Sequence, residues 1–145
     1  MKGGGSAEEA ALRAVADVIV PGTDGHPPAS ALGVHLRLAS CLEMAQPGAT
    51  SLLVLLLDMY ARVQRPDARF AELTPMQQDS VLRELAADES DELRDLVDVV
   101  HVYTLNGYFS DWPGRCTETG DFTAPPIWQA MGYHGPSLEH LAFHA

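Results

Sequence analysis

Apolar residues in the first two thirds of the chain recur every three or four positions, which is the spacing of amphipathic α-helices. The first such segment opens with a capping box, in which Ser6 is followed three residues later by Glu9. It is predicted to end at Pro21-Gly22, because this pair breaks a helix. Its apolar face consists of Leu12, Val15, Ala16 and Ile19.

Two more helices are predicted in the middle of the chain. The second runs from about Ser30 to Ala45, where Pro47-Gly48 stops it. The third starts from a cap at Thr50 or Ser51 and reaches Arg65. Because its first half is apolar on nearly all sides, we expect the third helix to lie at the centre of the fold. On the second helix, the side expected to face the core contains Leu32, His35, Leu36 and Ala39.

The fourth and fifth helices carry clear start signals. Thr74-Pro75-Met76-Gln77 combines a cap, a proline in the first turn and the glutamine of a capping box, and the helix is expected to end near Ala87. The acidic run from Asp88 to Glu92 suits the first turn of the fifth helix, since negative charge is favourable at a helix N-terminus. Asn106-Gly107 is predicted to end this helix in a left-handed turn.

Beyond this point, aromatic residues, glycines and prolines become frequent. We predict a loop from Tyr108 to Pro126 and two short helices, Ile127–Met131 and Ser137–His144. No segment has the alternating pattern of a strand. The predicted fold class is therefore all-α, with about five amphipathic helices and an irregular C-terminal extension rich in proline, glycine and aromatic residues.

The length suits one domain. Residues 1–6 are predicted to be a flexible N-terminus, and residues 7–145 a single helical domain. Within that domain, residues 107–145 are predicted to form a docking tail, because irregular segments that carry their own aromatics usually pack on the core or on a partner.

Charge excludes two classes of partner. Twenty acidic residues stand against nine basic ones, which gives a net charge of −11. Nucleic acids require a clustered basic face, and anionic membranes also repel excess acid. The most apolar run, Leu52 to Leu57, is closed by Asp58 and predicts a buried helix instead of a membrane span. We therefore expect no nucleic acid partner and no membrane insertion.

The start of the chain has neither an apolar signal segment nor a twin arginine. We therefore expect the chain as given to be cytoplasmic. A periplasmic location is expected instead if a twin-arginine leader has been removed.

Few residues of the chain are candidates for a chemical role. Cys41 is expected to pack as a small hydrophobic residue. Cys116 is the more reactive candidate because the neighbouring Arg115 favours its thiolate, with an idle loop thiol as the alternative. Asp111 follows a predicted helix end, where a turn-forming hydrogen bond explains it better than acid–base catalysis. We predict no catalytic residue and no cofactor-binding residue in this chain.

A metal site is the alternative interpretation. His140 and His144 are four residues apart and would share a helical face, with His134 nearby. Two histidines at this spacing can bind zinc, but no recognised metal motif surrounds them. On this alternative the chain is a stand-alone metal-binding helical protein or an enzyme that uses these histidines.

Several short motifs are distributed along the chain in a characteristic order, from Leu12 to Pro136. Each motif is weak alone, and their order and spacing together are informative. In sequence order they are Val18-Ile19-Val20-Pro21, Ala31-Leu32-Gly33-Val34, Phe70-x-x-Leu73-Thr74-Pro75-x-Gln77-Gln78, Leu82-x-x-Leu85, Gly107-Tyr108-Phe109-Ser110-Asp111, and Trp128-x-x-Met131-Gly132-Tyr133-x-Gly135-Pro136.

This series of motifs resembles the gluconate 2-dehydrogenase subunit 3 family, the small subunits of flavin-dependent sugar dehydrogenases. One departure lies at Trp112-Pro113-Gly114-Arg115, where the family usually has a tyrosine and Gly-Gly-Asn. The resemblance implies a helical small subunit without a cofactor of its own. It also implies a large partner subunit of the glucose–methanol–choline (GMC) oxidoreductase type, which carries FAD and oxidises the sugar, with a cytochrome c subunit as a further possible member.

On this interpretation, the C-terminal part of the chain forms much of the contact with the large subunit, because aromatic residues and arginine are enriched at the centres of interfaces. For Trp128 and Tyr133 the alternative is that they pack the tail onto the third and fifth helices. The predicted interface residues are Tyr108, Phe109, Asp111, Trp112, Arg115, Cys116, Trp128 and Tyr133.

Overall fold

The structure is a computed structural model, and it describes residues 4–23, 25–110, 127–128 and 131–133. Within these residues the chain forms five α-helices and two short 3-10 helices, without a β-strand. The predicted all-α fold is confirmed. In chain order the elements are α1 (Gly4–Ile19), η1 (Ala29–Leu32), α2 (Val34–Ala45), α3 (Ala49–Gln64), η2 (Phe70–Glu72), α4 (Pro75–Ala86) and α5 (Asp91–Phe109).

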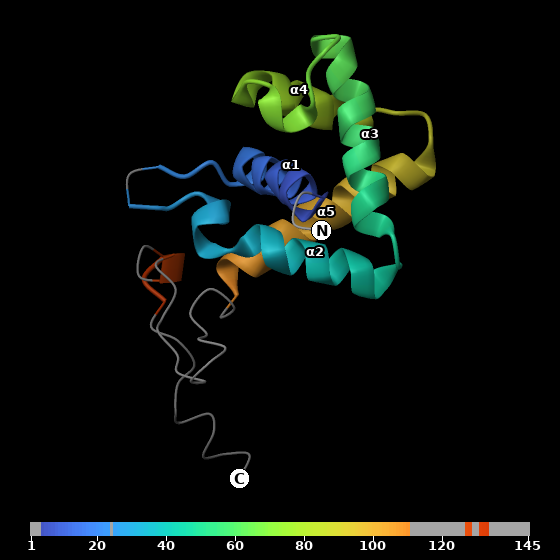
Figure 1. Cartoon of the computed structure of the whole chain (residues 1–145). Helices are drawn as coiled ribbons and strands as arrows, with labels where there is room; N and C mark the ends of the chain where they lie inside the picture. Colours follow the sequence, from blue (N-terminus) through green and yellow to red (C-terminus); the bar gives the residue numbers. More distant parts are fainter. Residues whose placement is uncertain (1–3, 24, 111–126, 129–130, 134–145) are drawn as a thin grey trace.

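The first helix is the central element of the bundle. α1 packs against each of the other four α-helices and both 3-10 helices. In Figure 1, α2 and α5 run side by side, α3 stands along the right-hand side, and α4 lies at the top. The prediction that the third helix lies at the centre is wrong, because α3 buries only one of its two apolar sides and exposes Leu52, Leu55, Met59 and Val63.

The buried residues form two clusters. The larger lies where α1 meets α2, α3, α4 and α5, and Phe70 of η2 is fully buried in it. The smaller lies at the end of α5, where Tyr108 and Trp128 pack with Ala16, Ala29, Val34 and Ile127. The aromatic residues at the end of α5 are therefore tied to the start of α2 and to α1.

The predicted second helix is divided in two. The 3-10 helix η1 ends at Gly33, whose φ of +71° reverses the chain before α2 begins at Val34. This break rotates α2 relative to η1, so that His35 and Leu38 face the core. Leu36, predicted to face the core, is instead exposed, because the predicted face assumed one continuous helix.

The cap of α3 comes from a residue that precedes the α2–α3 turn. The N-cap position is Gly48, and the carboxylate of Glu43 accepts hydrogen bonds from the N–H groups of Gly48 (3.0 Å) and Thr50 (3.2 Å). These bonds lower the pKa of Glu43 below its ordinary value of 4.5. The predicted cap at Thr50 or Ser51 is wrong, because both residues already belong to the helix and Glu43 supplies the acceptor.

The start of α4 is as predicted. The Thr74 hydroxyl accepts from the N–H of Gln77, and the Gln77 side chain accepts from the N–H of Thr74. This reciprocal pair satisfies two N–H groups that the helix leaves free.

The starts of α1 and α5 differ by a few residues from the prediction. α1 begins at Gly4, ahead of the expected cap at Ser6, and a shift of this size is within the range over which terminal turns vary. α5 begins after Ser90, whose hydroxyl is its cap. Asp88 precedes the helix and accepts hydrogen bonds from Tyr60 and from the N–H of Ser90 instead.

Gly107 does not end α5, which continues through Phe109 to its C-cap at Ser110. A Cβ atom at this glycine would lie 3.1 Å from Cγ1 of Val34 and 3.5 Å from Cδ of Arg37. The glycine is thus placed where α5 lies close to the start of α2. The prediction that Asn106-Gly107 ends the helix is wrong, because a glycine can mark close packing as well as a helix end.

We expect Gly107→Leu to lower the free energy of unfolding by roughly 1–3 kcal/mol, since Val34 is fully buried and cannot move aside. Gly107→Ala is the matched comparison, because its gain in helix propensity of about 1 kcal/mol opposes the tight contact. Urea denaturation of both variants measures the difference. Equal stability of the leucine and alanine variants would contradict the close approach.

We expect Glu43→Gln to destabilise the fold at neutral pH, because the amide has one acceptor oxygen and no charge for the start of α3. The pKa of Glu43 is lower in the folded chain, so its stabilising effect is complete above the ordinary pKa and disappears as the pH falls through the folded value. The stability difference from the parent chain should therefore shrink below about pH 4. Denaturant titrations across this range, with Glu89→Gln as the control, provide the measurement.

Candidate functional site

The predicted interface residues that the structure describes gather at one corner, beyond the start of α2. Tyr108 is 1% exposed and Trp128 is 7% exposed, so both belong mainly to the chain's own core. Phe109 and Tyr133 are 44% and 46% exposed. We call these four residues the aromatic corner, in which two rings are buried and two are presented to solvent.

Hydrogen bonds fix the two buried rings. The Tyr108 hydroxyl donates to the carbonyl of Pro27 at 2.7 Å, and burial raises its pKa. The Trp128 indole N–H donates to the carbonyl of Phe109 at 3.1 Å. The first bond ties α5 to the loop before η1, and the second ties residue 128 to the last turn of α5. Both rings are therefore positioned by polar contacts as well as by packing.

The two exposed rings stand edge-on to the buried ones. The Trp128 and Tyr133 ring centroids are 4.9 Å apart with planes at 76°, and those of Tyr108 and Phe109 are 5.3 Å apart at 78°. This T-shaped geometry is favourable between aromatic rings. Each exposed ring thus packs against a buried ring, and such packing lowers the conformational entropy that is lost on binding a partner.

An apolar hollow of about 300 Å³ lies beside the aromatic corner, between the end of α1 and the end of α5. Ile19, Leu105, Phe109 and Ile127 contribute apolar side chains to its wall, and His26 contributes a polar one. A hollow of this kind suits an apolar side chain of a protein partner better than a polar small molecule.

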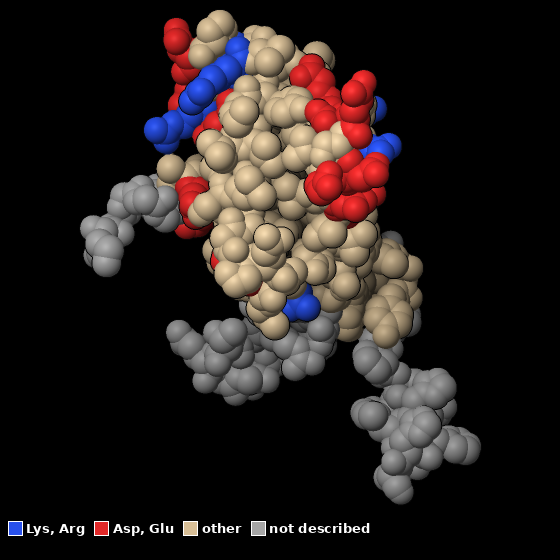
Figure 2. Space-filling view, turned by 90° about the vertical axis from the view of Figure 1, so that its right-hand side faces the viewer, with Lys and Arg blue, Asp and Glu red and all other residues tan. Residues whose placement is uncertain are grey.

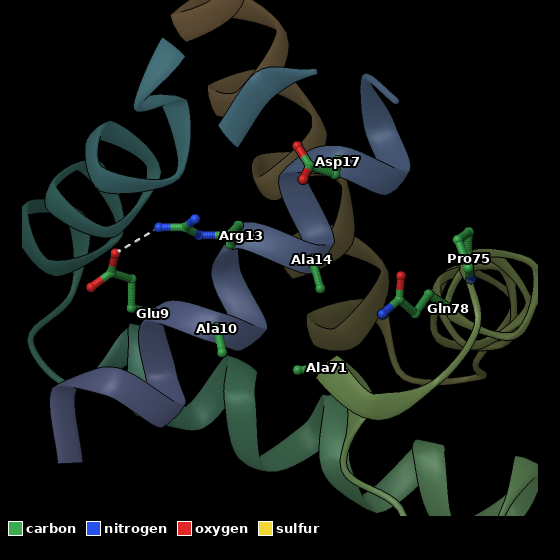
Figure 3. A pocket seen from close by; sticks show the side chains of 8 residues that line it. All are labelled: Glu9, Ala10, Arg13, Ala14, Asp17, Ala71, Pro75 and Gln78. Atoms are coloured by element: carbon green, nitrogen blue, oxygen red, sulfur yellow. Dashed lines mark hydrogen bonds and ion pairs between the residues drawn. The ribbon is translucent and has the colours of Figure 1, made fainter. Parts of the chain in front are cut away.

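A hollow of about 610 Å³ lies between α1 and the segment from η2 to α4 (Figure 3). Its polar groups are already engaged in the fold. Arg13 binds Glu9 at 3.1 Å, Asp17 accepts from the N–H and hydroxyl of Ser30, and Gln78 donates to a core carbonyl. Its remaining wall is largely alanine. This arrangement explains how α1 is held, because these polar groups bind other parts of the fold.

The remaining predicted interface residues, Asp111, Trp112, Arg115 and Cys116, lie outside the described residues, as do the histidines His134, His140 and His144. Their assignments stay predictions. Within the described residues, no three His, Cys, Asp or Glu side chains are placed to hold a metal ion.

The sequence analysis missed a second surface, which lies on α3. Leu52, Leu55, Met59 and Val63 follow one another at intervals of three and four residues and are between 48% and 75% exposed. We call this stripe the outer face of α3. Figure 2 views the molecule from the side on which α3 stands and shows a broad uncharged surface, with basic and acidic groups at its upper left border and mainly acidic groups at its right-hand border. The signal for it was present in the apolar run from Leu52 to Leu57, which was interpreted as a sign of complete burial.

None of the described helices is long and apolar enough to cross a membrane by itself. α2 and α3 reach that length and composition only when taken together, and the chain bends by 115° between them.

The chain matches one known family. The model of the family described as gluconate 2-dehydrogenase subunit 3 matches residues 6–126, from the first helix to beyond the end of α5. No curated protein and no solved structure matches the chain. Since the match covers most of the sequence, this chain belongs to the gluconate 2-dehydrogenase subunit 3 family.

Proposed function

We propose that this chain is a non-catalytic accessory subunit that binds and stabilises a large FAD-dependent subunit of the GMC oxidoreductase type. The observation that carries the proposal is the family match over residues 6–126, since the family is described as one subunit of a dehydrogenase. The large subunit would hold the FAD and oxidise a sugar or glycoside. A cytochrome c subunit would be a further member of the complex and accept its electrons.

The surface of the chain supports a role in association. Both the aromatic corner and the outer face of α3 present large apolar side chains to solvent in the isolated chain. Contiguous exposed apolar surface of this kind marks protein–protein interaction sites. Binding only to the folded large subunit would stabilise that subunit by mass action, which is how a small subunit without chemistry of its own can support a complex.

The described polar groups are consistent with a supporting role. The side chains of Asp17, Glu43 and Asp58 accept hydrogen bonds from backbone N–H groups of the chain itself. Each of them fixes the start of a helical turn. Their chemistry is therefore used to hold the bundle together.

We expect the chain to co-purify with a GMC-type large subunit from the same genome when both are co-expressed and the small subunit carries the affinity tag. The captured large subunit should show flavin absorbance, and its soluble yield should fall when the small subunit is omitted. A GMC-type oxidoreductase from an unrelated genome serves as the control. If the chain is recovered alone and monomeric with every large subunit of its own genome, the proposed function is wrong.

A further inference from the structure

The outer face of α3 is a continuous stripe that none of the described residues covers. From Leu52 to Val63 it extends over about 16 Å of helix at the rise of an α-helix. Leu55 and Met59, in the middle of the stripe, are 57% and 51% exposed. Single exposed apolar residues need no explanation, but a contiguous row along one helix does.

The opposite side of α3 packs against the other helices of the chain. Thr50, Leu53, Leu57 and Ala61 are buried against the rest of the bundle. The helix is therefore apolar on two sides, and among the described residues only one of these sides is packed. A helix that is apolar all round is normally buried all round, so the outer face indicates a second body packed against α3.

Acidic groups border one edge of this stripe. On that edge of α3, the Tyr60 hydroxyl donates to Asp88, and the Gln64 amide donates to Glu84 at 3.2 Å. The hydrogen bond from Tyr60 lowers the pKa of Asp88, which keeps this carboxylate charged. The turn into α5 adds the exposed carboxylates of Glu89 and Glu92. Figure 2 shows acidic groups gathered along the right-hand border of the uncharged surface.

We propose that the outer face of α3 is the docking surface for the large FAD-dependent subunit, which meets it with an apolar ridge and with basic side chains on the α4–α5 side. This inference rests on the proposed function and adds where the partner binds and which chemistry it presents. The acidic border favours a partner with a cationic rim. The proposed function supplies the large subunit as that partner.

A second copy of this chain fits the surface poorly. Two antiparallel copies of α3 packed face to face about a twofold axis would place one acidic border against the other. Each copy would also carry a net charge of −11, so their approach would be opposed by repulsion. The aromatic corner lies on the other side of Figure 1 from α3 and is thus a separate surface.

The test is capture of the large subunit by the double variant Leu55→Glu, Met59→Glu in the full chain. We expect capture to weaken by roughly tenfold or more, because two charges would be buried in an apolar contact. Met76→Glu is the matched control, since Met76 is 81% exposed and does not belong to the outer face of α3. The residue before it, Pro75, lines the hollow beside α1. This control should capture the large subunit as the parent chain does. Circular dichroism of each variant checks that it folds.

A second measurement uses the unaltered complex. Oxidation of Met59 by hydrogen peroxide should slow when the large subunit is bound, whereas oxidation of Met76 should not. Mass spectrometry of the small subunit gives both rates from the same sample.

The outcomes separate this inference from the proposed function. If the parent chain and the double variant capture the large subunit equally, or if Phe109→Glu abolishes capture and the double variant does not, the docking surface is assigned wrongly and the proposed function stands. If the parent chain captures no large subunit, both fail. If light scattering shows a dimer of the chain alone that the double variant dissociates, a second copy occupies the face and the inference is overturned.

Discussion

The close approach of α5 to the start of α2 at Gly107 is the contact on which the aromatic corner depends. With no side chain at this position, the helix backbone can lie against Val34. The next residue, Tyr108, then enters the pocket formed by Ala16 and Ala29 and reaches the carbonyl of Pro27. The carbonyl of Phe109 is in turn placed to receive the indole N–H of Trp128. Because Gly107 has no Cβ, α5 can pack against Val34 and bring Tyr108 and Phe109 to the aromatic corner.

A second constraint comes from the central position of α1. This helix can bury side chains on several sides because every other helix packs on it, and alanines such as Ala11 and Ala16 are buried beside Leu12 and Val15. Because α1 occupies the centre of the bundle, α3 lies at its periphery and packs with one side. The outer face of α3 is left exposed as a consequence of that packing, although it consists of large apolar residues.

Charge and apolar surface are arranged in a way that suits association with a different protein. The carboxylates of Asp17, Glu43 and Asp58 hold turns in place through backbone N–H groups. At the turn into α5, Asp88 has the same role toward the N–H of Ser90, whereas Glu89 and Glu92 are exposed. Figure 2 shows acidic groups beside the uncharged surface on the side where α3 stands. An acidic border beside an apolar stripe discourages self-association and favours a partner with basic groups, which is consistent with the family's description as one subunit of a dehydrogenase.

The sequence by itself determined the all-α class, the family and the capping box at Thr74 and Gln77, because these depend on residues that are close together in the chain or on an ordered series of local motifs. It also drew attention to the aromatic residues around Tyr108 and Trp128. Only the tertiary structure decided which of their rings are buried, that Glu43 caps α3, that Gly107 lies inside a helix, and that α1 and not α3 is central. Each of these depends on which helices meet in space, and the periodicity of one helix shows that it has an apolar side without showing what covers that side.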